Sequence, residues 1–92
     1  MIRTFADART SGLFETGKSR RWHSIARVAV RKLVQIDSVT SLDELNAPPG
    51  NRLETLRGDR AGQHSIRIND QWRICFRWAA DGVYDVEIVD YH

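Results

Sequence analysis

A strict alternation between residues 71 and 78 constrains the fold of this chain more than any other stretch. The large apolar residues there are Trp72, Ile74, Phe76 and Trp78. The residues between them are Arg73, Cys75 and Arg77. A period of two predicts a half-buried strand whose apolar side faces a core. Ala80-Asp81-Gly82 then supplies turn residues, and Val83–Val89 reads as a returning strand, so the sequence predicts an antiparallel hairpin.

The first half of the chain has a helical period instead. Met1–Phe5 could form a short edge strand, and Asp7–Thr16 predicts a short helix with Asp7 as N-cap and Gly17 as terminator. We expect the longest helix to run from Ser19 to about Asp37. Its predicted apolar stripe, at spacings of three and four residues, consists of Trp22, Ile25, Ala26, Ala29, Leu33 and Ile36.

The second half contains short segments joined by turns. Ser41 and Glu44 fit the capping box of a single helical turn. Short strands are expected at Leu53–Leu56 and Gln63–Asn69, on either side of the glycine-containing loop Arg57–Gly62. Asn69-Asp70 should then turn the chain tightly into the Trp72 strand. Residues 1–92 are therefore expected to form one α+β domain, with N-terminal helices on one face of a small antiparallel sheet and the other face partly open.

The positive charges are clustered although the net charge is only +2. The stretch Lys18–Lys32 contains no acid, so one side of the molecule should be basic. Such a surface is either an ordinary solvated face or a surface that contacts the phosphates of RNA or DNA. The candidate RNA-binding residues are Lys18, Arg20, Arg21, Arg27, Arg31 and, in the loop, Arg60.

Several classes of site do not fit the sequence. The single cysteine, Cys75, excludes an internal disulfide and a cysteine-based zinc site, and its mid-strand position favours a buried, inert thiol. The histidines at 23, 64 and 92 are too scattered to predict a metal site, and no glycine-rich nucleotide loop is present, so no cofactor is expected. No long apolar run suggests a signal peptide or a membrane span, and we expect a cytoplasmic protein.

The sequence ends on three side chains that can hold or move protons: Asp90, Tyr91 and His92. By parity, Arg73 should face away from the core, and Glu54 and Arg57 come from the first strand of the sheet or its end. Such a set could cleave a phosphodiester without a metal: a base takes the ribose 2′-hydroxyl proton, an acid protonates the leaving 5′-oxygen, and arginines stabilise the charged phosphorus centre. Each residue also has a structural alternative, with Tyr91 as a core aromatic and Asp90 as a cap.

Three motifs together resemble the HigB toxins of the RelE/ParE superfamily. They are the Leu-x-Gly-Asp-Arg-x-Gly stretch from Leu56 to Gly62, the Trp-Arg-Ile-x-Phe stretch from Trp72 to Phe76, and the terminal Asp-Tyr-His. The start of the chain and its basic helix also match, so the resemblance covers essentially the whole chain. It implies a RelE-like microbial RNase fold and ribosome-dependent cleavage of mRNA. It also implies a helix-turn-helix antitoxin that neutralises the toxin and binds the operator DNA.

The resemblance also implies a catalytic set. Arg73, Asp90, Tyr91 and His92 match positions that the family uses in or near its active site, and Arg57 stands where some relatives have lysine. Glu54 departs from relatives that carry histidine there. Glu54 could itself be the base, the terminal residues could do more of the work, or the activity could be low.

A second class of function follows from the same resemblance. ParE relatives inhibit DNA gyrase, and a non-catalytic module could bind only antitoxin and operator DNA. Arg73 and the terminal triplet argue against this alternative, because a binding surface does not need groups that transfer protons. Glu54 in place of histidine favours it.

Overall fold

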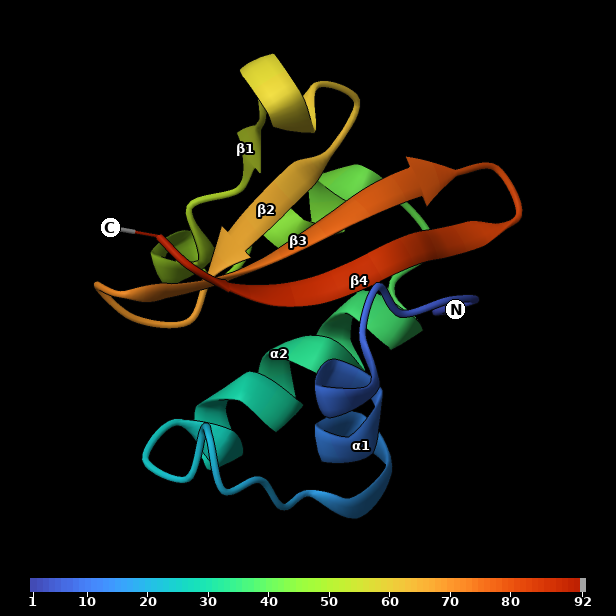
Figure 1. Ribbon diagram of the computed structural model, residues 1–92. Helices are drawn as coiled ribbons and strands as arrows, with labels where there is room; N and C mark the ends of the chain where they lie inside the picture. The colour runs from blue at the N-terminus through green and yellow to red at the C-terminus, as the bar shows by residue number, and fades with distance from the viewer. Residues whose placement is uncertain (92) are drawn as a thin grey trace.

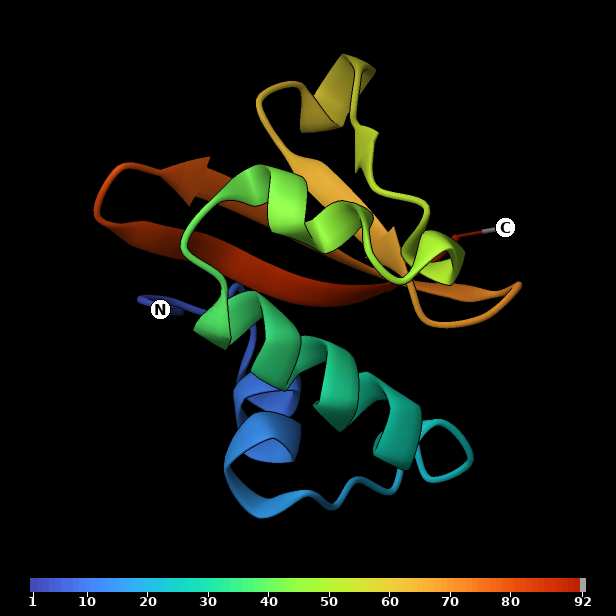
Figure 2. The ribbon, with the colours of Figure 1, turned by 180° about the vertical axis from the view of Figure 1, so that it is seen from behind.

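The computed structural model describes residues 1–91 and has two α-helices and a four-stranded antiparallel sheet. The helices are α1 (Ala8–Thr16) and α2 (Ala26–Ser38), and the strands are β1 (Glu54–Thr55), β2 (His64–Arg67), β3 (Trp72–Ala79) and β4 (Gly82–Asp90). The strand order is β1-β2-β3-β4, with every pair antiparallel. Figures 1 and 2 show both α-helices on one side of the sheet, at the opposite end of the molecule from β1. The predicted α+β class is confirmed.

The hairpin predicted from the alternation is present. Arg73 pairs with Val89 and Ala79 with Gly82, so a two-residue turn joins β3 to β4. The register shifts between Cys75 and Arg77, where β4 accommodates one extra residue and Asp85 adopts a φ of 55°. This is a β-bulge, which bends the strand and increases its twist.

The helix predicted from Ser19 begins later than expected. Residues 21–25 form turns, with the Trp22 amide donating to Ser19 Oγ, and α2 begins only at Ala26. A helix begun at Ser19 would place Arg20 and Arg21 at the positive end of its dipole, which is unfavourable. Trp22 is nevertheless buried as the predicted stripe requires, and so are Ile25, Ala29, Leu33 and Ile36.

Other local predictions are confirmed, except that one expected strand is shorter than predicted. Asp7 caps α1 by accepting from the Thr10 amide, and Gly17 ends it with a φ of 73°. The Glu44 carboxylate accepts from the Ser41 amide at the start of the 3₁₀ turn η1 (Leu42–Asn46), as the capping box predicts. The expected N-terminal edge strand is reduced to two isolated parallel bridges that Ile2 and Phe5 form with β4. No helix within residues 1–91 is long and apolar enough to cross a membrane.

The core lies between the helices and the aromatic side of the sheet. Its fully buried members include Leu33 and Ile36 from α2, Leu45 from η1, and Ile74 and Phe76 from β3. The helices therefore cover the face of β3 that carries Ile74 and Phe76. The opposite face, which carries Arg73, is called the open face below.

Candidate functional site on the open face

Arg73 is the centre of the open face. Its Nε donates to Ser65 Oγ at 2.8 Å, and its Nη2 donates to the Arg52 carbonyl at 2.6 Å and to the Ser65 carbonyl at 3.3 Å. The residue is only 5% exposed. The prediction that Arg73 lies on the face away from the core is confirmed, and the face, which was expected to be partly open, is covered around this residue. The segment leading into β1 crosses over the guanidinium, because Arg52 turns in a left-handed conformation with a φ of 45°.

Two further side chains lie against this guanidinium. Glu54, on β1, places its Oε1 at 3.2 Å from Arg73 Nη2. Tyr91 lies just after β4, and the Arg73 guanidinium sits 5.3 Å from the centre of its ring. Such a cation–π contact holds the guanidinium plane in place while most of its hydrogen-bond donors remain in use. The predicted neighbours Glu54, Arg73 and Tyr91 therefore form one cluster.

The remaining residues of the C-terminal triplet are placed differently. Asp90 pairs across the sheet with Trp72, so its side chain lies on the helix side of the sheet. Its Oδ2 accepts a hydrogen bond from the Gln71 side chain at 3.1 Å. Asp90 and Tyr91 together line a hollow of about 340 Å³ with Arg60 and Val89. His92, the third predicted member, lies outside the described residues. The structure thus brings Asp90 close to the cluster without showing it on the guanidinium.

The loop that follows β1 contributes two arginines. Arg57 is exposed, and none of residues 1–91 forms an ion pair with it. Arg60 instead donates to Glu87 on β4 at 3.1 Å and to Gln63. Gly62 has a φ of 89°, and a side chain there would meet the Arg77 guanidinium at 3.0 Å, so glycine is needed where the loop returns to the sheet.

Cys75 lies between the arginines on the same face of β3. It is fully buried, and burial raises the pKa of its thiol. A thiol in this environment stays protonated at neutral pH and is a poor nucleophile. The prediction of a buried, inert cysteine is confirmed.

The predicted basic surface lies on the other side of the molecule. Lys18, Arg20 and Arg21 are on the loop before α2 rather than on the expected helix, and Arg27 and Arg31 are on α2. All five are exposed, and none forms an ion pair with any of residues 1–91. Arg21 contacts the Trp72 ring, with its guanidinium carbon 5.7 Å from the ring centre.

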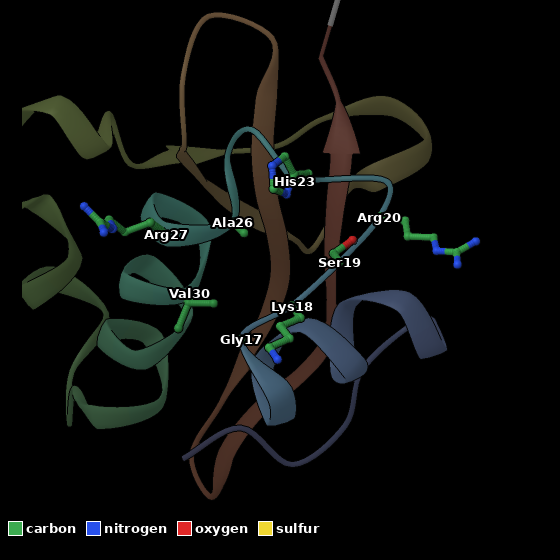
Figure 3. Close-up of a pocket in the computed structure, with 8 residues that line it drawn as sticks. All are labelled: Gly17, Lys18, Ser19, Arg20, His23, Ala26, Arg27 and Val30. Carbon is green, nitrogen blue, oxygen red and sulfur yellow. The ribbon is translucent and has the colours of Figure 1, made fainter.

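A groove of about 1260 Å³ runs between this loop and α2 (Figure 3). Its walls carry Lys18 and His23 on the loop side and Val30 on the helix side. The guanidinium groups of Arg20 and Arg27 point away from each other in Figure 3. Divergent cations of this kind suit contacts spread along a polyanion better than one enclosed anion site. Arg60 is the only one of the six predicted RNA-binding residues that lies on the open face.

Sequence reasoning missed two of the groups that hold Arg73. Ser65 is completely buried on β2 and supplies both a hydroxyl and a carbonyl acceptor. The only sequence signal for Ser65 was the alternation along β2, which puts it on the same face as Arg67. The Arg52 carbonyl had no signal, because its position depends on the backbone turn before β1.

Comparisons with known proteins agree with this fold and with the motifs. Residues 3–92 match the family model described as the RelE-like toxin of the type II toxin-antitoxin system HigB. The chain is 39% identical over 85 residues to Toxin HigB-1 of Vibrio cholerae, covering 90% of this chain and 88% of that protein. It is 34% identical over 94 residues to Endoribonuclease HigB of Proteus vulgaris, with 100% of both chains covered.

A solved structure also shares the fold. It is the YoeB-YefM complex from Staphylococcus aureus, with a TM-score of 0.57, 14% sequence identity, and coverage of 100% of this chain and 98% of that one. At that identity the likeness concerns the fold alone. The family match and the two relatives are what decide the family: this chain belongs to the HigB-like, RelE-like toxins of type II toxin-antitoxin systems.

Proposed function

We propose that this toxin is a metal-independent endoribonuclease that cleaves mRNA on the ribosome and so inhibits translation. The observation that carries the proposal is the cluster around Arg73, where a buried guanidinium is fixed by Ser65 and lies against Tyr91 at the end of β4. Preorganised cationic donors of this kind stabilise the charge that develops on phosphorus during cleavage. The relative from Proteus vulgaris, which matches over its full length, is named an endoribonuclease.

The proton-transfer roles go to the C-terminal triplet. Asp90, Tyr91 and His92 are the candidates for acid and base, because they are consecutive in the sequence and Tyr91 contacts the Arg73 guanidinium. Arg57 is exposed in the loop after β1, and we assign it to an adjacent phosphate. In the reaction the 2′-oxygen forms a bond to the adjacent phosphorus as the bond from phosphorus to the 5′-oxygen breaks. The base takes the 2′-hydroxyl proton and the acid protonates the leaving 5′-oxygen, so no redox group is needed.

The helix-layer cations have a separate role in this proposal. These cations, which are Lys18, Arg20, Arg21, Arg27 and Arg31, lie on the helix side of the sheet, whereas Arg73 is on the opposite face. We assign them to phosphates of the ribosome, which would orient the toxin without reading sequence.

A toxin of a type II system has an antitoxin partner. We propose that this partner is a helix-turn-helix protein that neutralises the toxin and carries it to operator DNA, and that both act in the cytoplasm. A gene for a helix-turn-helix protein of one domain's length beside the toxin gene would support this assignment.

Primer extension on mRNA from cells expressing the toxin tests the proposal. New 5′ ends should appear inside codons of translated messages and disappear when translation of that message is blocked. Intact transcripts in cells that stop growing would contradict it. Intact transcripts with altered plasmid supercoiling would favour gyrase inhibition, the alternative for which the acid at position 54 gives the one specific argument.

A further inference from the structure

The ion pair between Glu54 and Arg73 joins groups of very different exposure. The Arg73 side chain is 6% exposed, whereas that of Glu54 is 50% exposed. The hydrogen-bond acceptors of the guanidinium are Ser65 Oγ, the Ser65 carbonyl and the Arg52 carbonyl, which are neutral and belong to buried or backbone groups. Among residues 1–91, Glu54 is thus the one anion that forms an ion pair with Arg73, and its exposed side chain can move into water without disturbing the buried contacts.

A phosphate group competes for the same donors. Guanidinium binds carboxylates and phosphates through the same paired N–H geometry, and two anions on one guanidinium repel each other. A buried arginine without a counter-ion is also costly, so some anion should remain close to Arg73 in the free protein.

We propose that Glu54 occupies the place on Arg73 that the RNA phosphate takes during the reaction, and that the substrate displaces this carboxylate when it binds. Glu54 is then a residue that sets RNA affinity. The inference rests on the proposed function, because it assumes that Arg73 contacts the substrate phosphate.

This role and that of a general base predict opposite results for Glu54→Gln. Loss of a base should abolish cleavage and leave RNA affinity nearly unchanged. Loss of a competing anion should raise RNA affinity, because the amide keeps the shape of the side chain but not its charge. Cleavage at low RNA concentration should then be retained or increased.

The experiment measures binding of a single-stranded RNA oligonucleotide, 2′-O-methylated throughout so that it cannot be cleaved, by fluorescence anisotropy. We expect E54Q to bind about fivefold more tightly than the wild type. The matched control is E15Q, which removes one negative charge from an exposed position on α1 and should change the affinity less than twofold. Thermal unfolding of each variant confirms that it is folded.

A double variant locates the effect. In an R73K background, E54Q should give no comparable gain, because the shared donors are gone. A second measurement needs no Arg73 variant. The Arg73 Nε–H resonance is followed by NMR while inorganic phosphate is added to the wild type and to E54Q. The change in its chemical shift should saturate at a lower phosphate concentration in E54Q.

The inference is overturned if E54Q binds RNA no more tightly than the wild type, whatever that affinity is. It is also overturned if the gain equals that of E15Q or persists fully in R73K. Cleavage separates it from the proposed function. E54Q that binds normally but cannot cleave translated mRNA would make Glu54 the base and leave the endoribonuclease standing. If the wild type never cleaves RNA but E54Q binds RNA more tightly, the proposed function is wrong, and the displacement of Glu54 from Arg73 by a phosphate still stands.

Discussion

The arginines on the two sides of this toxin differ in their ion pairs, with the exposed Arg57 as an exception on the side of the sheet. On the open face, Arg60 pairs with Glu87, Arg73 with Glu54, and Arg77 with Asp85. On the helix layer, Arg27 and Arg31 form no ion pair with any other described residue. Both sides are rich in arginine, so composition does not separate them; the position of the acids does.

This difference in ion pairing indicates that the two sides have different functions. Ion pairs restrict the orientation of a guanidinium group, and burial restricts that of Arg73 further, which suits chemistry at one phosphorus atom. Unpaired, exposed cations give attraction without fixed geometry, and their effect falls steeply with salt. Affinity and catalysis should therefore be separable by substitutions on opposite faces.

The largest effect is expected from Arg73→Lys. Lysine keeps the charge but loses the planar set of donors that reaches Ser65 and Arg52, so the cleavage rate should fall about 100-fold. The free energy of unfolding should fall by about 2 kcal/mol, because buried acceptors lose their partners. Single-turnover cleavage and urea denaturation measure the two quantities. A variant that is folded and cleaves at the wild-type rate would contradict the assignment of Arg73.

Charge removal on the helix layer should affect binding instead. Replacing Arg20, Arg27 and Arg31 by glutamine should weaken ribosome binding about tenfold and reduce its salt dependence, since each lost phosphate contact lowers the slope of log affinity against log salt by up to about one. The free energy of unfolding should change by less than about 0.5 kcal/mol, because the positions are exposed.

Single substitutions provide the matched control for that comparison. R27Q and R77Q each remove one positive charge, but the Arg77 charge is already paired with Asp85. Ribosome affinity measured at two salt concentrations should fall more in R27Q than in R77Q. Equal losses would show that net charge alone determines binding.

A smaller effect is expected at Ser65, which we assign as a positioning residue for Arg73. Ser65→Ala removes the hydroxyl that accepts a hydrogen bond from Arg73 Nε. The cleavage rate at saturating ribosome concentration should fall about tenfold. The ribosome concentration that gives half the maximal rate should change little. Ser65→Thr restores the hydroxyl and should recover most of the rate. If threonine fails to recover the rate although the variant is folded, the hydroxyl is not what matters.

The smallest effect concerns His64, on the core side of β2. Burial lowers the pKa of His64 below that of an unfolded histidine, so the unfolded chain takes up the proton first as pH falls. Stability should therefore decrease between about pH 7 and pH 5 through this residue, and H64Q should reduce that decrease in urea denaturation. The pH profile of cleavage should be the same in H64Q, because His64 contacts Phe76 and Thr55 rather than Arg73.

Periodicity was sufficient to predict the sheet and the core. Ile74 and Phe76 are buried against α2 and η1 as the alternation requires, and the caps at Asp7 and Gly17 are where their side-chain chemistry predicts. The start of α2 was predicted too early, because an apolar stripe continues through Trp22 although the backbone there is not helical. Burial of Trp22 depends on tertiary contacts that a periodic pattern alone cannot distinguish from helix.

The site was less predictable than the fold. Parity placed Arg73 on the correct face and motifs brought in Glu54 and Tyr91, but the ion pair and the burial of the guanidinium depend on the backbone turn at Arg52. The motif grouped Asp90 with Tyr91, but Asp90 lies two residues after the buried Ile88 and pairs with Trp72, so its side chain is on the helix side of the sheet. Clustering of charge in sequence did not show that the helix-layer cations and Arg73 lie on different faces.

Single-turnover cleavage of ribosome-bound mRNA at increasing ribosome concentration tests the central claim most directly. It compares the wild type, R73K and the triple variant of Arg20, Arg27 and Arg31. If chemistry occurs on the open face and attraction on the helix layer, the triple variant should reach the wild-type rate at saturation, and R73K should stay about 100-fold slower at any concentration. A triple variant that remains slow at saturation, beside an R73K that recovers, would contradict the account.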